Sequence, residues 1–260
     1  QNALLAQLGR IARQCDGVRC DMAMLVLPEV FERTWGISAP SFWPPATEAV
    51  RAKVPGFLFL AEVYWGLDYT DDKGLYGRLE EGHARPVREH LFAGRELQDH
   101  LARFLENHDE PRAAATFAPE VHRAAAILTF LTPGLRFFHQ GQREGKRVRI
   151  PVHLGRGPVE APEAGIGAFY DALLECLKDP AFRGGDWQLL ECRPAWDGNE
   201  TSDAFVAFSW TGAGERRRLV AVHHPVVARD REVHHLAHDD LPVLHHRRRA
   251  DAVDAEDPQL

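Results

Sequence analysis

The first sixty residues alternate between helical and strand patterns of apolar positions. Apolar side chains recur every three or four residues over 4–15, which predicts an amphipathic helix. A largely apolar run over 17–27 favours a strand that is buried on both faces. Helical spacing returns over 41–53, and 57–63 is a second apolar run. This order of elements is typical of parallel β-α-β units.

The same alternation continues through the middle of the chain. Helical spacing covers 85–100 and 120–131, and short strands are expected at 103–107 and 135–138. A further helix is expected over 168–178. Helices that alternate with buried strands predict an α/β fold, as a sheet or a barrel.

The last third of the chain has a different character. Short strand patterns separated by turns with Gly, Asn and Asp predict a small antiparallel β-rich domain over 185–222. Seven of the fourteen histidines lie in residues 223–260, beside Arg247, Arg248 and Arg249. A metal-binding tail would need a fixed Cys/His spacing, and none is present. We therefore expect 223–260 to be a poorly ordered, solvated tail that holds no metal.

Composition narrows the classes of function. The chain of 260 residues is 45% hydrophobic and 27% charged, as in an ordinary globular protein, and its net charge is −7. Nucleic acids and anionic membranes attract basic surfaces, so neither is an expected partner. No apolar run approaches the roughly 20 residues that span a bilayer. A neutral substrate rich in hydroxyl groups, such as a sugar, is compatible with this negative net charge.

The four cysteines form no CxxC pair, and we expect them to be thiols in a reducing compartment, the cytoplasm. The chain starts at Gln1, and no secretory leader follows. We therefore expect it to begin within a longer protein.

Acidic residues stand where three of the predicted strands end. Asp21 lies late in the first apolar run, Glu62 ends the second, and Asp109 follows the third. Period-two geometry places Arg19 on the same strand face as Asp21. Because the carboxyl ends of parallel strands meet at one face of a barrel, these carboxylates are expected to converge there.

These residues stand in three sequence motifs: Gly17-x-Arg19-x-Asp21-x-Ala23, Glu62-Val63 and Phe104-x-x-Asn107-His108-Asp109. Together the motifs closely resemble signatures of the α-amylase family (glycoside hydrolase family thirteen). The stretch 133–142 is also similar to the family's last barrel strand and the loop after it. The resemblance implies that 1–180 form the C-terminal part of a (β/α)8 TIM barrel, followed by a small antiparallel β domain.

The resemblance also implies roles for the acidic residues in a retaining glycoside hydrolase that acts on α-glucosidic bonds. Asp21 would be the nucleophile that forms a glycosyl-enzyme ester, and Arg19 would keep it ionised and oriented. Glu62 would be the general acid and base, in surroundings that keep it protonated when the substrate arrives. Asp109 would bind sugar hydroxyls and stabilise the transition state.

Neighbouring residues are expected to contact the α-glucan or malto-oligosaccharide substrate. His108 would be a neutral hydrogen-bond partner, and Asn107 belongs to the same motif. Tyr64 and Trp65 are candidates for stacking on sugar rings, although packing explains such an aromatic pair equally well.

The chain departs from the family pattern at Met24 and Leu25, where many α-amylases carry a Lys-His pair. This departure argues against strict α-amylase specificity, so an α-glucanotransferase or isomerising enzyme with the same carboxylates stays an alternative. It also argues against the family's structural calcium, and we expect no cofactor.

Two gaps complete the comparison. The family's first signature has no counterpart in this chain, and too few residues separate Glu62 from the strand-like run 67–75 for a parallel crossover. An inactive fragment or non-catalytic relative is therefore the second alternative, and the chain alone is not expected to be a competent enzyme.

Overall fold

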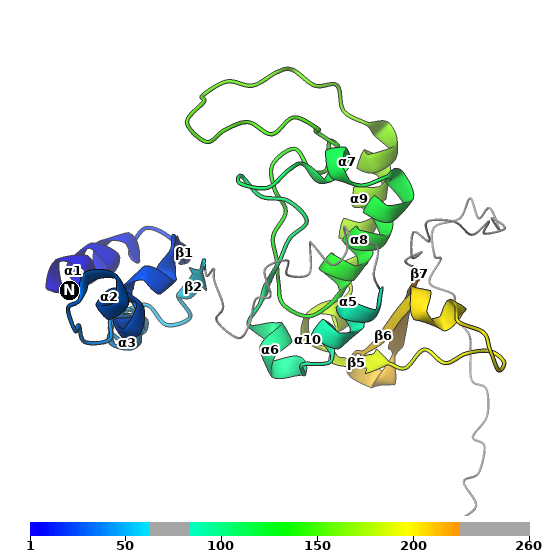
Figure 1. Cartoon of the computed structure of the whole chain (residues 1–260), viewed down its shortest axis with the longest axis horizontal. Coiled ribbons are helices and arrows are strands. Elements are labelled where there is room, and N and C mark those ends of the chain that lie inside the picture. The colour runs from blue at the N-terminus through cyan, green and yellow to red at the C-terminus, as the bar shows by residue number, and fades with distance from the viewer. Residues whose placement is uncertain (63–83, 224–260) are drawn as a thin grey trace, which may run out of the picture. The chain divides into compact units, whose positions relative to one another are not determined.

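The computed structural model describes residues 1–62 and 84–223, and these belong to two compact units, one within Gln1–Arg78 and one within Leu79–Leu260 (Figure 1). The strand-like run 67–75 and the tail beyond His223 lie outside the described residues. Within the described ranges, no helix is long and apolar enough to cross a membrane.

The first unit combines helices with one pair of short strands. Its elements are α1 (Asn2–Ile11), β1 (Gly17–Cys20), the 3-10 helix η1 (Ala23–Val26), α2 (Pro28–Trp35), α3 (Trp43–Arg51) and β2 (Leu58–Ala61). Strands β1 and β2 are parallel, with Gly17 opposite Leu58 and Cys20 opposite Ala61. Two segments that are 41 residues apart in sequence thus form the β-α-β unit that the apolar pattern predicts.

A small core holds this unit together. Ala12 from the end of α1, Val50 from α3 and Phe57 before β2 are buried against one another. Four partly buried apolar side chains pack on this cluster: Leu8, Val18, Val54 and Phe59. Helices α1 and α3 and both strands therefore contribute to one core.

The strand expected over 17–27 is wrong beyond Cys20. Met22 adopts left-handed backbone angles (φ 44°, ψ 45°), and η1 follows it directly. Positive φ is incompatible with continued strand pairing. The expected burial on both faces is also wrong, since Arg19 is exposed and its neighbours in β1 are half-buried. Helix α2, with Pro28 in its first turn, was not predicted.

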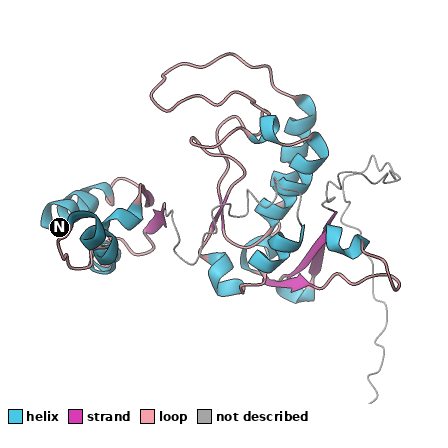
Figure 2. Cartoon of the chain, viewed as in Figure 1, coloured by secondary structure: helices cyan, strands magenta, loops and turns pink. Residues whose placement is uncertain are grey.

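The second unit contains more elements and longer loops, as Figure 2 shows. Its helices are α5 (Ala84–Leu91), α6 (Arg95–Asp99), α7 (Ala113–Thr116), α8 (Pro119–Leu131), α9 (Ala164–Cys176) and α10 (Ala181–Gly184), with 3-10 helices η2 (Thr201–Ala204) and η3 (Ala213–Glu215). Its strands are β3 (Ala102–Arg103), β4 (Leu135–Arg136), β5 (Asp186–Leu190), β6 (Phe205–Thr211) and β7 (Arg217–His223).

Strands β5, β6 and β7 form an antiparallel sheet in that order, which confirms the predicted β-rich segment. Trp210 of β6 is buried, and its indole N–H donates to the Leu131 carbonyl of α8 at 2.7 Å. Arg88 of α5 donates to the carbonyls of Asp203 and Phe205, at 3.0 and 2.5 Å. The sheet therefore packs on helices of its own unit, and the predicted domain division near residue 180 stays a prediction.

Strands β3 and β4 pair in parallel, with Ala102 opposite Leu135 and Arg103 opposite Arg136. Each has two residues, so the strands expected over 103–107 and 135–138 are wrong in their extent. In the described part of the chain, the strands form three small sheets and none closes into a barrel. The α/β class with parallel pairs followed by an antiparallel sheet is confirmed, whereas a closed barrel is not seen.

Candidate active site

Two of the candidate carboxylates directly follow the paired ends of β1 and β2. Cys20 and Ala61, the last residues of the two strands, are register partners, so Asp21 and Glu62 leave the sheet side by side. The Glu62 N–H donates to the Cys20 carbonyl at 3.0 Å and extends the ladder by one bond. This is the local arrangement that the strand-exit argument predicts.

One guanidinium joins these two carboxylates. Arg19 donates from Nη1 to Oδ1 of Asp21 and from Nη2 to Oε1 of Glu62. The Asp21 side chain is 76% exposed, whereas that of Glu62 is 13% exposed. The site therefore offers one carboxylate open to an incoming molecule and a second that is largely sheltered, with a shared cation between them.

The unusual backbone of Met22 has a direct role in holding Glu62. The Met22 N–H donates to Oε2 of Glu62 at 2.8 Å, and the Ala23 N–H donates to the Glu62 carbonyl at 3.0 Å. Positive φ in a residue with a side chain costs free energy, and such strain is concentrated at functional sites. Arg19 and Met22 together bind both oxygens of the Glu62 carboxylate.

The third carboxylate belongs to the second unit, on a loop that follows β3. The Asn107 side-chain oxygen accepts from the N–H groups of Asp109 and Glu110, at 2.9 and 2.8 Å, which makes a compact turn. His108 Nε2 lies 3.0 Å from Oδ2 of Asp109, and both side chains are nearly half exposed. Arg149 donates to the Asp109 carbonyl at 2.7 Å.

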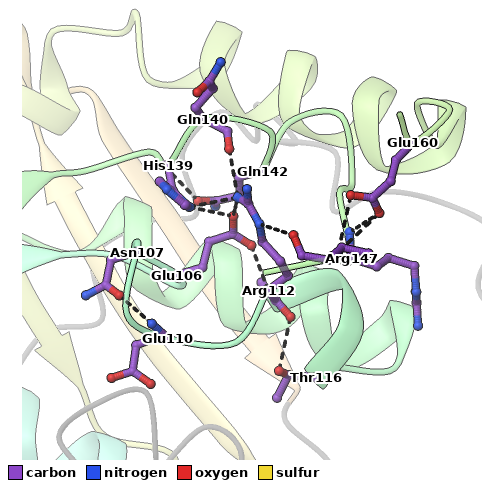
Figure 3. A network of polar contacts seen from close by, with 12 residues as sticks. Glu106, Asn107, Glu110, Arg112, Thr116, His139, Gln140, Gln142, Arg147 and Glu160 are labelled. Carbon is purple, nitrogen blue, oxygen red and sulfur yellow. Dashed lines mark hydrogen bonds and ion pairs between the residues drawn. The ribbon is translucent and has the colours of Figure 1, made fainter. Parts of the chain in front are cut away.

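A buried ion pair joins the residues at the two ends of this loop, as Figure 3 shows. Glu106 Oε1 accepts from Arg112 Nη1 at 2.6 Å, and the two side chains are 1% and 7% exposed. The Nδ1 atom of His139 lies 3.2 Å from the same carboxylate oxygen. The sequence argument assigned no role to these residues, although a Glu beside the buried Leu105 was a signal that a partner must exist.

The structure therefore brings Arg19, Asp21 and Glu62 together, and separately groups Asn107 and His108 around Asp109. Convergence of all three carboxylates on one substrate stays a prediction. Tyr64 and Trp65 lie outside the described residues.

The described residues hold neither a cluster of metal ligands nor a disulfide. No group of three or more His, Cys, Asp or Glu residues in 1–62 and 84–223 is placed to hold a metal ion. All four cysteines are free, and Cys15 is exposed.

Known structures share this fold, although no family model and no curated protein matches the sequence. A maltogenic α-amylase from Thermotoga neapolitana matches 86% of this chain with 20% identity and a TM-score of 0.60. A debranching enzyme from Nostoc punctiforme matches 86% with 18% identity and a TM-score of 0.63. An α-amylase from Lactobacillus plantarum matches 87% with 19% identity and a TM-score of 0.61.

The chain has the fold of part of an α-amylase-type enzyme. Its matches cover 53%, 51% and 55% of those three proteins, so the chain spans about half of their length. The resemblance that the sequence motifs indicate is confirmed at the level of the fold, and partial coverage agrees with the expected partial barrel.

Proposed function

We propose that the chain carries the catalytic carboxylates of a retaining glycoside hydrolase that cleaves α-glucosidic bonds in oligo- or polysaccharides. The observation that supports this most is the position of Asp21 and Glu62, side by side at the ends of two paired parallel strands. A retaining mechanism needs two carboxyl groups close together, one as nucleophile and one as acid. The similarity to α-amylases and to a debranching enzyme supports the α-glucan substrate class.

In the proposed mechanism, a carboxylate oxygen of Asp21 attacks the anomeric carbon while the leaving oxygen takes the proton of the Glu62 carboxyl group. The products of this step are a glycosyl ester on Asp21 and a free sugar hydroxyl. The Glu62 carboxylate then takes a proton from water, which attacks the anomeric carbon and releases Asp21. Asp109 stabilises the positive charge that develops on the sugar ring, and no cofactor is needed.

Azide rescue tests the two roles in a longer protein that contains this chain, because the chain alone is not expected to be a competent enzyme. In Asp21→Gly, azide takes the place of the missing nucleophile and should convert an α-maltosyl fluoride to the azide of inverted configuration. In Glu62→Ala, azide attacks the glycosyl ester and should give the retained configuration. Either variant should lower kcat by at least about 10³-fold without azide. The control is Glu29→Gln, at an exposed position on α2. A retained azide from Asp21→Gly and an inverted azide from Glu62→Ala would exchange the two roles.

Products from maltoheptaose separate the hydrolase from an α-glucanotransferase or isomerising enzyme. Water as the acceptor gives shorter sugars alone, whereas a sugar acceptor gives a ladder of both shorter and longer chains. The replacement of the family's Lys-His pair by Met24 and Leu25 is the observation that favours testing this alternative. In the structure Met24 is buried and Leu25 is 42% exposed. Both side chains are apolar, so neither supplies a polar contact to a sugar.

A further inference from the structure

We propose that Glu106 and Arg112 are positioning residues of the candidate site and that, with His139, they form a buried clamp that sets the place of His108 and Asp109. The proposal rests on the proposed function only for the statement that Asp109 acts on a sugar. The clamp itself follows from the geometry of the loop between its two charged residues.

The clamp closes the loop at its base. Glu106 immediately precedes residues 107–111 and Arg112 immediately follows them, so the 2.6 Å ion pair joins the two ends of a five-residue segment. The second oxygen of Glu106 accepts the N–H of Ala113 at 2.7 Å. Glu106 therefore fixes both the side chain of Arg112 and the backbone just beyond it.

The clamp also ties this loop to the segment that follows β4. Arg112 Nη1 donates to the Gln140 carbonyl at 2.8 Å, and its Nε donates to the Val148 carbonyl at 3.3 Å. Figure 3 shows the Arg112 guanidinium beside Glu106, His139 and Gln140. Val148 is in turn held from outside, because the Glu160 carboxylate accepts the N–H groups of Arg147 and Val148.

His139 completes the clamp. Its Nδ1 atom lies 3.2 Å from Oε1 of Glu106 and 2.8 Å from Nη1 of Arg112. The same Nη1 atom donates to Glu106 and to the Gln140 carbonyl. Oε1 of Glu106 thus contacts both Arg112 and His139, while Oε2 accepts the N–H of Ala113.

Residues 107–110 depend on the clamp for their position. Asn107 organises the turn from inside through the N–H groups of Asp109 and Glu110. Arg149, which is exposed, reaches the Asp109 carbonyl from outside at 2.7 Å. Exposed contacts of this kind contribute little free energy, whereas breaking a buried ion pair leaves an unpaired charge and is strongly destabilising. The position of Asp109 is therefore set mainly from the clamp.

Amide hydrogen exchange on the full chain tests the proposal. Arg112→Met should raise the exchange rates of the Asp109 and Glu110 amides by about tenfold or more, because their turn loses its fixed base. The matched control is Arg143→Met, which removes an exposed pair with Asp171 in the same unit and should leave these rates unchanged. Unchanged rates in Arg112→Met would overturn the clamp.

A double variant separates positioning from general stability. Glu106→Gln with Arg112→Met leaves no buried charge unpaired and keeps an acceptor for the Ala113 amide, so the melting temperature should recover relative to Arg112→Met alone. The Asp109 and Glu110 amides should still exchange fast, while the α8 amides stay as protected as in wild type. Wild-type exchange in the loop of the double variant would refute the positioning role, even where the single variant unfolds.

Sugar binding gives a functional measurement. With maltoheptaose as the probe in titration calorimetry, the double variant should bind at least tenfold more weakly than wild type, and Arg143→Met should bind equally well. A wild-type chain that binds no maltoheptaose would contradict the proposed function, and the exchange rates would then decide the clamp alone. Equal affinity of wild type and the double variant would overturn the positioning role.

Discussion

At the scale of single residues, the most informative group outside the site is a chain of buried polar side chains. Gln142 donates to the Tyr170 hydroxyl at 2.8 Å, and that hydroxyl lies 2.8 Å from Nε2 of His122. Because the hydroxyl oxygen accepts from Gln142, its own proton is available for Nε2 of His122. A neutral imidazole suits this arrangement, since a protonated His122 would take away the acceptor of the Tyr170 proton.

Burial is the larger cause, and the positive charge of Arg123 the smaller one, of a pKa of His122 that is lowered to about 4. Burial likewise raises the pKa of Tyr170 above its usual range. The unfolded chain, with an ordinary histidine, therefore binds more protons than the folded chain between about pH 6.5 and 4. This contribution to stability is complete above pH 6.5 and is lost as the pH falls toward 4.

We predict that His122→Gln removes this pH dependence, because glutamine accepts the same hydrogen bond without titrating. Wild type should lose up to about 3 kcal/mol of unfolding free energy between pH 7 and 4 from this residue alone. Urea denaturation at several pH values measures the difference between wild type and variant. His153→Gln, at an exposed position, should follow wild type. A variant with the wild-type pH slope would contradict the assignment.

At the scale of elements, close contact between β1 and β2 places Asp21 beside Glu62. A Cβ atom on Gly17 would lie 2.7 Å from Leu58 Cβ and 2.8 Å from the Leu58 carbonyl oxygen. Both atoms belong to the partner strand, so a side chain at position 17 must push the strands apart. Glycine is thus required where the ladder that leads to the carboxylates begins.

Gly17→Ala should therefore destabilise the first unit by about 1–3 kcal/mol, the usual cost of overpacking. Gly9→Ala is the matched control: Gly9 lies inside α1 with no atom within 4 Å of a new Cβ, so alanine should stabilise the helix by up to about 1 kcal/mol. Thermal unfolding of the two variants compares them directly. A Gly17→Ala chain as stable as wild type would show that the strands separate without cost.

Helices and strands are predicted well from the sequence where a local pattern of apolar residues determines them. The apolar periodicity locates α1, α3 and α8 closely, and the short strand patterns between turns locate the sheet of β5 to β7. It overextends β1, since Glu62 draws the backbone of Met22 out of the strand through a contact 40 residues away in sequence. Long-range polar contacts leave no local pattern.

The candidate site was likewise predictable only in part. Asp21, Glu62 and Asp109 stand in recognisable motifs, and the parallel register of β1 and β2 follows from the β-α-β pattern. The supporting contacts do not follow, because Arg112 meets Glu106 across six residues and His139 meets it across 33. Their pairing depends on how two loops fold on each other, which residue types alone do not specify.

At the scale of the whole molecule, the candidate carboxylates are divided between the two compact units. Asp21 and Glu62 belong to the unit within Gln1–Arg78, and Asp109 belongs to the unit within Leu79–Leu260. The proposed function assigns a role to residues of both units. A net charge of −7 does not oppose this, because a neutral glucan is insensitive to the protein's overall field.

The last prediction is that binding of maltoheptaose slows amide exchange in two separate segments, residues 58–62 with Met22 and residues 107–110. A sugar that contacts Asp21, Glu62 and Asp109 excludes water from the turns that carry them, and a bound state opens less often than a free one. The sheet of β5 to β7 lies in the same unit as Asp109 and serves as the internal reference, whose exchange should not change. Asp109→Asn, which keeps the size of the side chain, should weaken binding and so reduce the protection of every segment that the sugar protects. Protection limited to 58–62 and Met22 would remove Asp109 from the site and leave Asp21 and Glu62 to act with other partners.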